Sequence, residues 1–155
     1  MKMKTFELIT YDANYKNAFK VLNLRWIEKY FRIESKDIEQ TDNPEQCLAE
    51  GGEIFFVVEE GCAVGTCAMY KVGELKYELA KMAVDPEKHG KGYGDLLMKE
   101  SEGWARRQNA KEILILSNTV LVPAIALYKK HGFQTIHLGA HPDYERCNIE
   151  MTKTL

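Results

Sequence analysis

Residues 79–94 decide the fold of this 155-residue chain, and they read LAKMAVDPEKHGKGYG. An apolar run, expected to be a strand, leads into a glycine-rich turn, and the turn opens directly into a helical pattern from Asp95 onward. Gly90, Gly92 and Gly94 let the backbone come close to an anion. The first N–H groups of the following helix have no helical partner and lie at the positive end of its dipole. The stretch therefore predicts a cradle for a ligand that carries phosphate.

The spacing of these glycines excludes two common phosphate motifs. It matches neither G-x-G-x-x-G with an acidic residue downstream nor G-x-x-x-x-G-K-[ST] with its magnesium-binding hydroxyl. We therefore do not expect a dinucleotide or a hydrolysed nucleotide, although a nucleotide-binding protein stays open as an alternative. Taken alone, the three glycines are also compatible with a plain turn between a strand and a helix.

A second informative stretch is residues 118–133, which read NTVLVPAIALYKKHGF. A strand ends here and a helix begins, with Pro123 near its first turn. Gly132 supplies the left-handed residue that ends the helix, and Phe133 starts the next strand. Tyr128 is the residue of this stretch to which we assign a chemical role.

Together the two stretches resemble the GCN5-related N-acetyltransferases (GNAT). The glycine turn is similar to their acyl-CoA pyrophosphate loop, which reads Arg or Gln, two residues, Gly, one residue, Gly or Ala. The second stretch resembles their A-I-x-L-Y-x-K-x-G-F signature. His89 departs from the pattern, because it stands where the family has a longer hydrogen-bonding side chain. The resemblance implies acetyl-CoA as a co-substrate and no metal.

The order of the predicted elements also fits this family. Strands are expected at residues 6–10, 54–59, 63–71, 76–84, 112–117, 133–138 and 148–154. Helices are expected after a cap at Asp12, in one or two short pieces at 35–40 and 44–50, and at 92–108 and 121–131. This order favours an α+β fold with a mixed, mostly antiparallel sheet of about seven strands flanked by about four helices. By resemblance it is the acyl-CoA N-acyltransferase (GNAT) fold, in one domain that spans residues 1–155.

The strand at residues 76–84 contains an irregularity. Leu79 and Met82 are an odd number of positions apart, so both cannot face the same side of a regular strand. A bulge near Ala80 or Lys81 would resolve the conflict, and a bulge frees a backbone N–H. By resemblance, this N–H polarises the thioester carbonyl.

The resemblance also implies where the cofactor is held. The pantetheine arm would enter between strands that splay apart at residues 82–84 and 115–117, and the glycine turn would hold the pyrophosphate. The implied cofactor-binding residues are Met82, Ala83, Val84, His89, Gly90, Lys91, Gly92, Tyr93, Gly94, Asn118, Tyr128 and Lys130.

Acetyl transfer to an amine requires a base for the acceptor and a proton for the departing thiolate. An alkyl ammonium has a pKa of about 10.4 and a thiol one of about 8.5, so the acceptor must lose a proton near neutral pH. We expect Glu78 to be the base, directly or through a water, and Tyr128 to be the acid at the sulfur. Glu78 as a solvated or ion-paired residue, and Tyr128 as a filler of a helix face, stay open as alternatives. Asn118 is equally open to binding the pantetheine amides and to capping the next helix.

The acceptor side is less clearly marked in the sequence. We expect Trp26, Glu28 and Tyr30 to contact the substrate, and Glu28 is also compatible with a solvated helix face. His137 and His141 lack the spacing and carboxylate partners of a metal site. The expected acceptor is therefore a primary amine of a small molecule or a protein. A non-catalytic acyl-CoA-binding module is the alternative function.

Composition sets the remaining expectations. The net charge of −2, with 28% charged residues, gives no reason to expect nucleic acid or a membrane surface as a partner. The N-terminal residues lack the apolar run of a signal peptide, so we expect a cytoplasmic protein, monomeric or homodimeric. The four cysteines lie far apart in sequence, which favours free, buried thiols.

Overall fold

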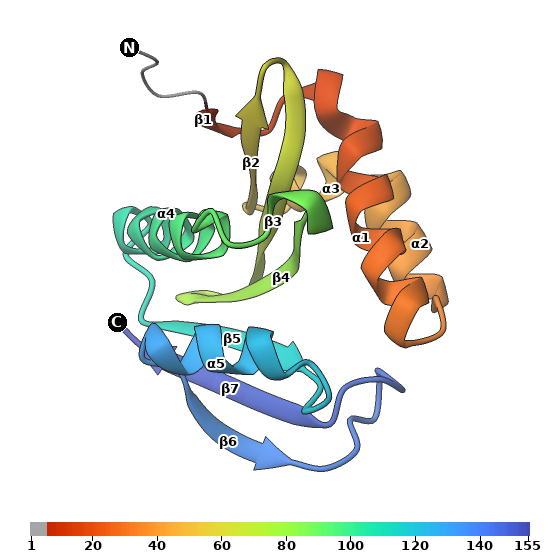
Figure 1. Cartoon of the computed structure of the whole chain (residues 1–155). Coiled ribbons are helices and arrows are strands. Elements are labelled where there is room, and N and C mark those ends of the chain that lie inside the picture. Colours follow the sequence, from red (N-terminus) through yellow and green to blue (C-terminus); the bar gives the residue numbers. More distant parts are fainter. Residues whose placement is uncertain (1–5) are drawn as a thin grey trace.

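Seven strands form a single mixed sheet in the computed structural model, which describes residues 6–155 (Figure 1). The strand order is β1-β2-β3-β4-β5-β7-β6, and all neighbours are antiparallel except β4 and β5. The strands are β1 (Phe6–Thr10), β2 (Glu53–Glu59), β3 (Cys62–Gly73), β4 (Lys76–Val84), β5 (Glu112–Ser117), β6 (Gln134–Leu138) and β7 (Ile149–Thr154). The predicted mixed, mostly antiparallel sheet is confirmed.

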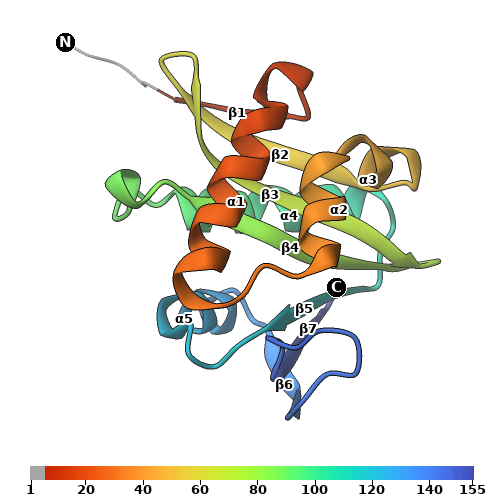
Figure 2. The ribbon, with the colours of Figure 1, turned by 90° about the vertical axis from the view of Figure 1, so that its right-hand side faces the viewer.

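Helices cover the two faces of the sheet (Figures 1 and 2). On one face lie α1 (Lys16–Tyr30), α2 (Ser35–Asp42) and α3 (Glu45–Ala49). On the other face, α4 (Tyr93–Arg107) packs against β2, β3 and β4. The last helix, α5 (Val122–Lys130), contributes to the same core as α4. Two 3-10 turns, Ala13–Tyr15 and Pro86–Lys88, precede α1 and the glycine turn.

Capping side chains explain where the helices on the first face begin. The Asp12 carboxylate accepts a hydrogen bond from the Asn14 N–H, so the predicted cap starts the 3-10 turn that leads into α1. At the start of α2, the side chains of Glu34 and Asp37 cap each other's backbone N–H reciprocally. This capping box fixes Asp37 on the inner side of α2, where it is fully buried.

The core has two parts because the central strands are covered on both faces. Along β2, Phe55 and Val57 point into the cluster beneath α4, whereas Ile54 and Phe56 point into the cluster beneath α1 and α3. Alternation with a period of two residues explains this division. The sheet therefore lies between two apolar clusters.

The structure corrects two details of the sequence prediction. Of the four free cysteines, Cys62 is exposed, because it is the first residue of β3 after the turn at Glu60 and Gly61. The strand predicted at residues 133–138 begins at Gln134, since Phe133 completes the turn after α5 by donating its N–H to the Tyr128 carbonyl. Within residues 6–155, none of the helices combines the length and apolar character needed to cross a bilayer.

Shortening a core side chain of β5 should destabilise the fold. Ile115 is 2% exposed, so Ile115→Ala is expected to lower the free energy of unfolding by about 2–5 kcal/mol through lost burial and a residual cavity. Ile136 on β6 is 57% exposed, and Ile136→Ala should change the free energy of unfolding by less than about 0.5 kcal/mol. Urea denaturation of both variants measures the difference, and equal effects would contradict this account of the core.

Candidate active site

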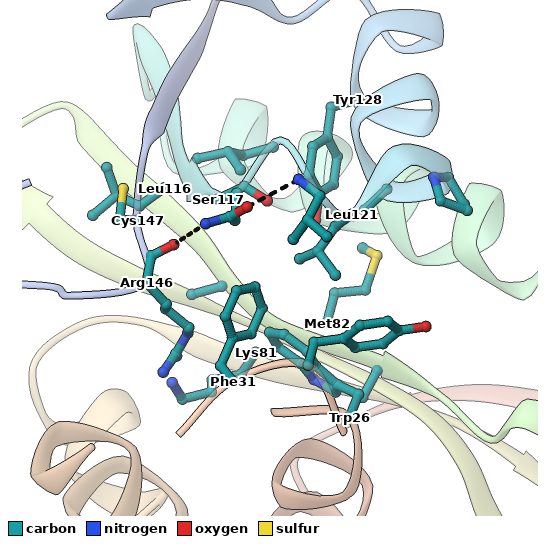
Figure 3. A pocket seen from close by; sticks show the side chains of 18 of the residues that line it. Trp26, Phe31, Lys81, Met82, Leu116, Ser117, Leu121, Tyr128, Arg146 and Cys147 are labelled. Atoms are coloured by element: carbon teal, nitrogen blue, oxygen red, sulfur yellow. Dashed lines mark hydrogen bonds between the residues drawn. The ribbon is translucent and has the colours of Figure 1, made fainter. Parts of the chain in front are cut away.

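Strands β4 and β5 separate after a short parallel ladder. Their pairing ends at Glu78 opposite Leu114, although both strands continue beyond these residues. The predicted divergence at residues 82–84 and 115–117 is therefore confirmed. A cavity of about 450 Å³ opens there, bounded by β4, β5, α1, α5 and the loop before β7 (Figure 3).

The predicted bulge lies beside this cavity, at Lys81 and Met82. Thr66 of β3 pairs with Ala83 and Ala68 pairs with Ala80, so two residues of β4 stand opposite one residue of β3. Lys81 has a φ of +54°, in the left-handed region. The insertion changes which face the later residues occupy, so Leu79 and Met82 both contact the α4 side of the core.

A buried ion cluster holds the bulge in place. The Lys81 Nζ lies 2.9 Å from the Asp37 Oδ1, and the two side chains are 3% and 0% exposed. Arg146, from the loop before β7, donates to both Asp37 oxygens, at 2.5 and 2.6 Å. It also donates to Glu34 at 3.4 Å. One carboxylate thus joins α2, β4 and the C-terminal loop.

Electrostatics favour the ionised form of Asp37. Burial alone would raise the pKa of this carboxyl, but the hydrogen bonds from Arg146 and the charge of Lys81 hold it well below its usual range. Arg146 also lies 5.8 Å from the Trp26 ring and 5.1 Å from the Tyr144 ring. The two cations of the cluster, Lys81 and Arg146, thus line the cavity, and Asp37 lies behind them.

Sequence analysis did not identify Asp37, Lys81 or Arg146 as site residues. The only local signal was a lysine at the expected bulge, where a non-glycine residue is strained. The residues that pair with it are distant, because Asp37 precedes Lys81 by 44 positions and Arg146 follows Asp37 by 109. Spacing along the chain cannot reveal such a contact.

Glu78 lies on β4, three residues before the bulge, and lines the cavity. Burial raises the pKa of this carboxyl, while the positive charges of Lys36, Lys81 and His141 oppose the shift. Within residues 6–155, no side chain forms a hydrogen bond or an ion pair with its carboxylate oxygens. A half-buried carboxylate with a raised pKa, open to a cavity, has the properties of a general base.

Tyr128 reaches the same cavity from α5 (Figure 3). Burial raises the pKa of its hydroxyl to about 12, with a smaller contribution from Cys67. The ring packs edge-on against Phe133 at a centroid distance of 6.4 Å. The hydroxyl is therefore protonated across the neutral range and available as a donor.

The glycine turn has the backbone conformation that only glycine adopts easily. Gly90 has a φ of +84° and Gly92 a φ of +82°, and Gly92 is the left-handed residue at the start of α4. A Cβ at Gly94 would lie 3.2 Å from the Leu127 Cδ2, so glycine lets α4 approach α5 closely. The three predicted glycines thus serve two purposes, an open turn and a close helix contact.

Side chains of the turn contact the protein itself. The His89 Nε2 lies 3.1 Å from the Val84 carbonyl oxygen, so the ring folds back on the end of β4. The Lys91 Nζ lies 3.2 Å from a carboxylate oxygen of Glu59, which also accepts a hydrogen bond from the Tyr93 hydroxyl. Glu59, at the end of β2, was not predicted, and it ties this turn to the sheet.

Asn118 and Lys130, which are also predicted to contact the cofactor, form hydrogen bonds or an ion pair within the chain. The Asn118 side chain accepts from the Val120 N–H at 2.9 Å and donates to the Arg146 carbonyl at 2.6 Å. The first bond closes a turn that precedes α5, which itself begins without a side-chain cap, so the predicted helix cap is not formed. The second bond links β5 to the loop before β7 (Figure 3). The Lys130 Nζ lies 2.8 Å from Asp95 in the first turn of α4.

Of the three residues predicted to contact the acceptor, helix geometry places two in the cavity wall and one outside it. Trp26 and Tyr30 are four positions apart, share one face of α1 and line the cavity. Glu28 is exposed and lies outside the cavity wall, because two positions along a helix turn a side chain to the opposite face. Phe31, which the sequence analysis did not single out, completes the aromatic wall.

Comparison with known proteins places these features in one family. A model described as the acetyltransferase (GNAT) family matches residues 19–133. An uncharacterized N-acetyltransferase of Schizosaccharomyces pombe is 30% identical over 99 residues, which are 61% of this chain and 61% of that protein. The chain therefore spans less than two thirds of that relative.

Two crystal structures share the fold. An acetyltransferase of the GNAT family from Staphylococcus aureus Mu50 superposes with a TM-score of 0.88 at 22% identity, over 97% of this chain and 99% of that one. A GNAT superfamily phosphinothricin acetyltransferase from Sinorhizobium meliloti, in complex with acetyl-CoA, superposes with a TM-score of 0.78 at 16% identity. The superposition covers 98% of this chain and 89% of that one.

Removing the central carboxylate should destabilise the protein strongly. Asp37→Asn leaves Lys81 without its ion-pair partner and Arg146 with only the more distant Glu34, and we expect a loss of about 3 kcal/mol in the free energy of unfolding. The matched control is Asp42→Asn on the same helix, whose side chain is 50% exposed and whose pair with Lys20 should contribute at most about 1 kcal/mol.

The same variant should change the dependence of stability on pH. The pKa of Asp37 is lower in the folded state, so its contribution is complete above about pH 4 and is lost as the pH falls toward the folded-state value. Denaturation curves below pH 4 should therefore fall less steeply for Asp37→Asn than for the unmodified protein. Parallel curves would show that the cluster does not stabilise the ionised carboxylate.

Proposed function

The chain belongs to the acetyltransferase (GNAT) family, and on that premise we propose that it is an acetyl-CoA-dependent N-acetyltransferase. It would transfer the acetyl group directly to a primary amine of a small molecule or a protein, within a ternary complex. One observation carries the proposal: the cavity at the β4–β5 divergence is lined by the bulge, by Glu78 and by Tyr128 together. Donor, acceptor and proton-transfer groups can therefore meet in one place.

In this proposal, the backbone of the divergent strand binds the donor. The N–H freed at the bulge, on Met82, faces the thioester carbonyl, and the backbone of Ala83 and Val84 holds the pantetheine arm. The turn at Gly90 and Gly92, with the free N–H groups that begin α4, binds the pyrophosphate. The S. meliloti relative, which is solved with acetyl-CoA, supports this assignment of the donor.

The turn must hold its phosphates mainly through the backbone. His89 bonds to the Val84 carbonyl, and Lys91 and Lys130 are paired with Glu59 and Asp95. In this proposal both lysines, which are exposed, attract the phosphates through their charge in addition to their pairs with Glu59 and Asp95. This arrangement compensates for the missing long side chain at position 89.

The reaction consists of one substitution at the acetyl carbon. Glu78 accepts a proton from the acceptor ammonium, the amine nitrogen attacks the carbonyl carbon, and the C–S bond breaks. The electron pair of that bond leaves with the sulfur, and the Tyr128 hydroxyl donates a hydrogen bond and then a proton to the thiolate. The acylated nitrogen loses its second proton, which restores the Tyr128 hydroxyl, and Glu78 releases the first proton to solvent. The products are the acetylamide and free CoA.

Loss of the Tyr128 hydroxyl should slow turnover. Incubation with acetyl-CoA and a panel of primary amines should release free thiol only when an amine is present, and Tyr128→Phe should lower kcat by about 10²-fold or more. Tyr15→Phe, which removes a hydroxyl from a tyrosine packed against Phe56 outside the cavity, is the control. Tight CoA binding without thiol release across a broad panel would instead indicate a non-catalytic acyl-CoA-binding module.

The pH dependence of turnover tests the base. Glu78 acts when ionised, so kcat should fall as the pH falls through its pKa, which burial places above the usual range for a glutamate. Glu78→Gln should lower kcat by about 10²-fold and abolish this limb of the profile, whereas Glu74→Gln in the exposed turn before β4 should keep it. An unchanged profile in Glu78→Gln would exclude Glu78 as the base.

A further inference from the structure

The α1 end of the cavity is walled by aromatic side chains. The rings of Trp26 and Phe31 meet edge-on at 6.5 Å, and the Tyr30 ring lies 6.4 Å from Phe31. Tyr144 lies on the other side of Arg146, whose guanidinium contacts both its ring and that of Trp26. Figure 3 shows Trp26 and Phe31 beside Lys81 and Met82, on the side of the cavity opposite Tyr128.

The charges on the cavity wall are unequal. Among the described residues that line it, the cationic side chains are Arg25, Lys29, Lys81 and Arg146, and the one carboxylate is Glu78. Three of these cations, Arg25, Lys81 and Arg146, pair with carboxylates that do not line the cavity, namely Asp85, Asp37 and Glu34.

An acceptor with one ammonium group can therefore pair with Glu78, the one carboxylate among the lining residues. A second ammonium on the same molecule would meet cations and aromatic faces, several of which protein cations already cover. Burying a charge without a partner is unfavourable, so the wall selects against such acceptors.

We propose, on the basis of the N-acetyltransferase function above, that the acceptor is a monoamine that carries an aromatic or bulky apolar group. Its apolar group packs against Trp26 and Phe31, and its nitrogen points toward Glu78. Aromatic rings gain from edge-on contact in addition to the area they bury. Diamines and polyamines are disfavoured, because the wall offers a single carboxylate.

Two pairs of amines test this selectivity by acetyl-CoA-dependent thiol release. The first pair is 2-phenylethylamine and ethylamine, for which we expect kcat/KM at least about tenfold higher with the aromatic amine. The second pair is n-butylamine and 1,4-diaminobutane, which share a chain length and differ in a second ammonium. We expect kcat/KM at least about tenfold lower with the diamine.

Variants assign the aromatic preference to the wall. Trp26→Leu should lower the ratio of kcat/KM between 2-phenylethylamine and ethylamine by about tenfold. Trp104→Leu is the matched control, since this tryptophan packs on α4 against Phe55 and Tyr77, outside the cavity. It should leave the ratio unchanged even if it lowers stability, because a ratio is insensitive to the fraction of folded protein.

The outcomes separate this inference from the proposed function. Turnover of 1,4-diaminobutane equal to that of n-butylamine, or an unchanged ratio in Trp26→Leu, overturns the acceptor assignment and leaves the acetyltransferase function standing. Absence of thiol release with all four amines and with a broad amine panel overturns both.

Discussion

Asp37 draws two cations into the interior, and each cation fixes a different wall of the cavity. Lys81 anchors the bulge of β4, so the backbone conformation at the bulge depends on a side chain of α2. Arg146 anchors the loop before β7, and its carbonyl accepts from Asn118, which in turn begins the turn into α5. A continuous chain of contacts therefore runs from α2 to the helix that carries Tyr128.

The free energy of this cluster does not by itself explain its presence. A buried ion pair recovers little more than the desolvation of its charges, and an apolar replacement of similar volume is often as stable. Lys81 adds a further cost, because a left-handed φ strains any residue except glycine. A glycine at position 81 would relieve the strain but could not reach Asp37. The contacts that Lys81 makes are thus better explained by the geometry they impose on the cavity than by stability.

How far the sequence predicts the site depends on how local each feature is. The glycine turn and the bulge follow from residues within a few positions of one another, and the structure has both of them. Helix periodicity also decides between Trp26 and Glu28, although the sequence analysis grouped them. By contrast, the contacts of Asp37 with Lys81 and of Glu59 with the glycine turn join distant segments. They depend on how α2 and β2 pack in three dimensions, which no local pattern encodes.

Burial raises the pKa of both proposed catalytic groups, and this shift suits one to act as a base and the other as an acid. It raises the pKa of Glu78 toward that of the acceptor it must deprotonate, and it keeps Tyr128 protonated as a donor. Both shifts require that water stay out of the cavity. An acceptor whose apolar group fills the aromatic end would displace water from the side of the cavity that faces α1. Acceptor selectivity and proton transfer would then depend on one physical condition, because a small acceptor that leaves water in the cavity would weaken both pKa shifts.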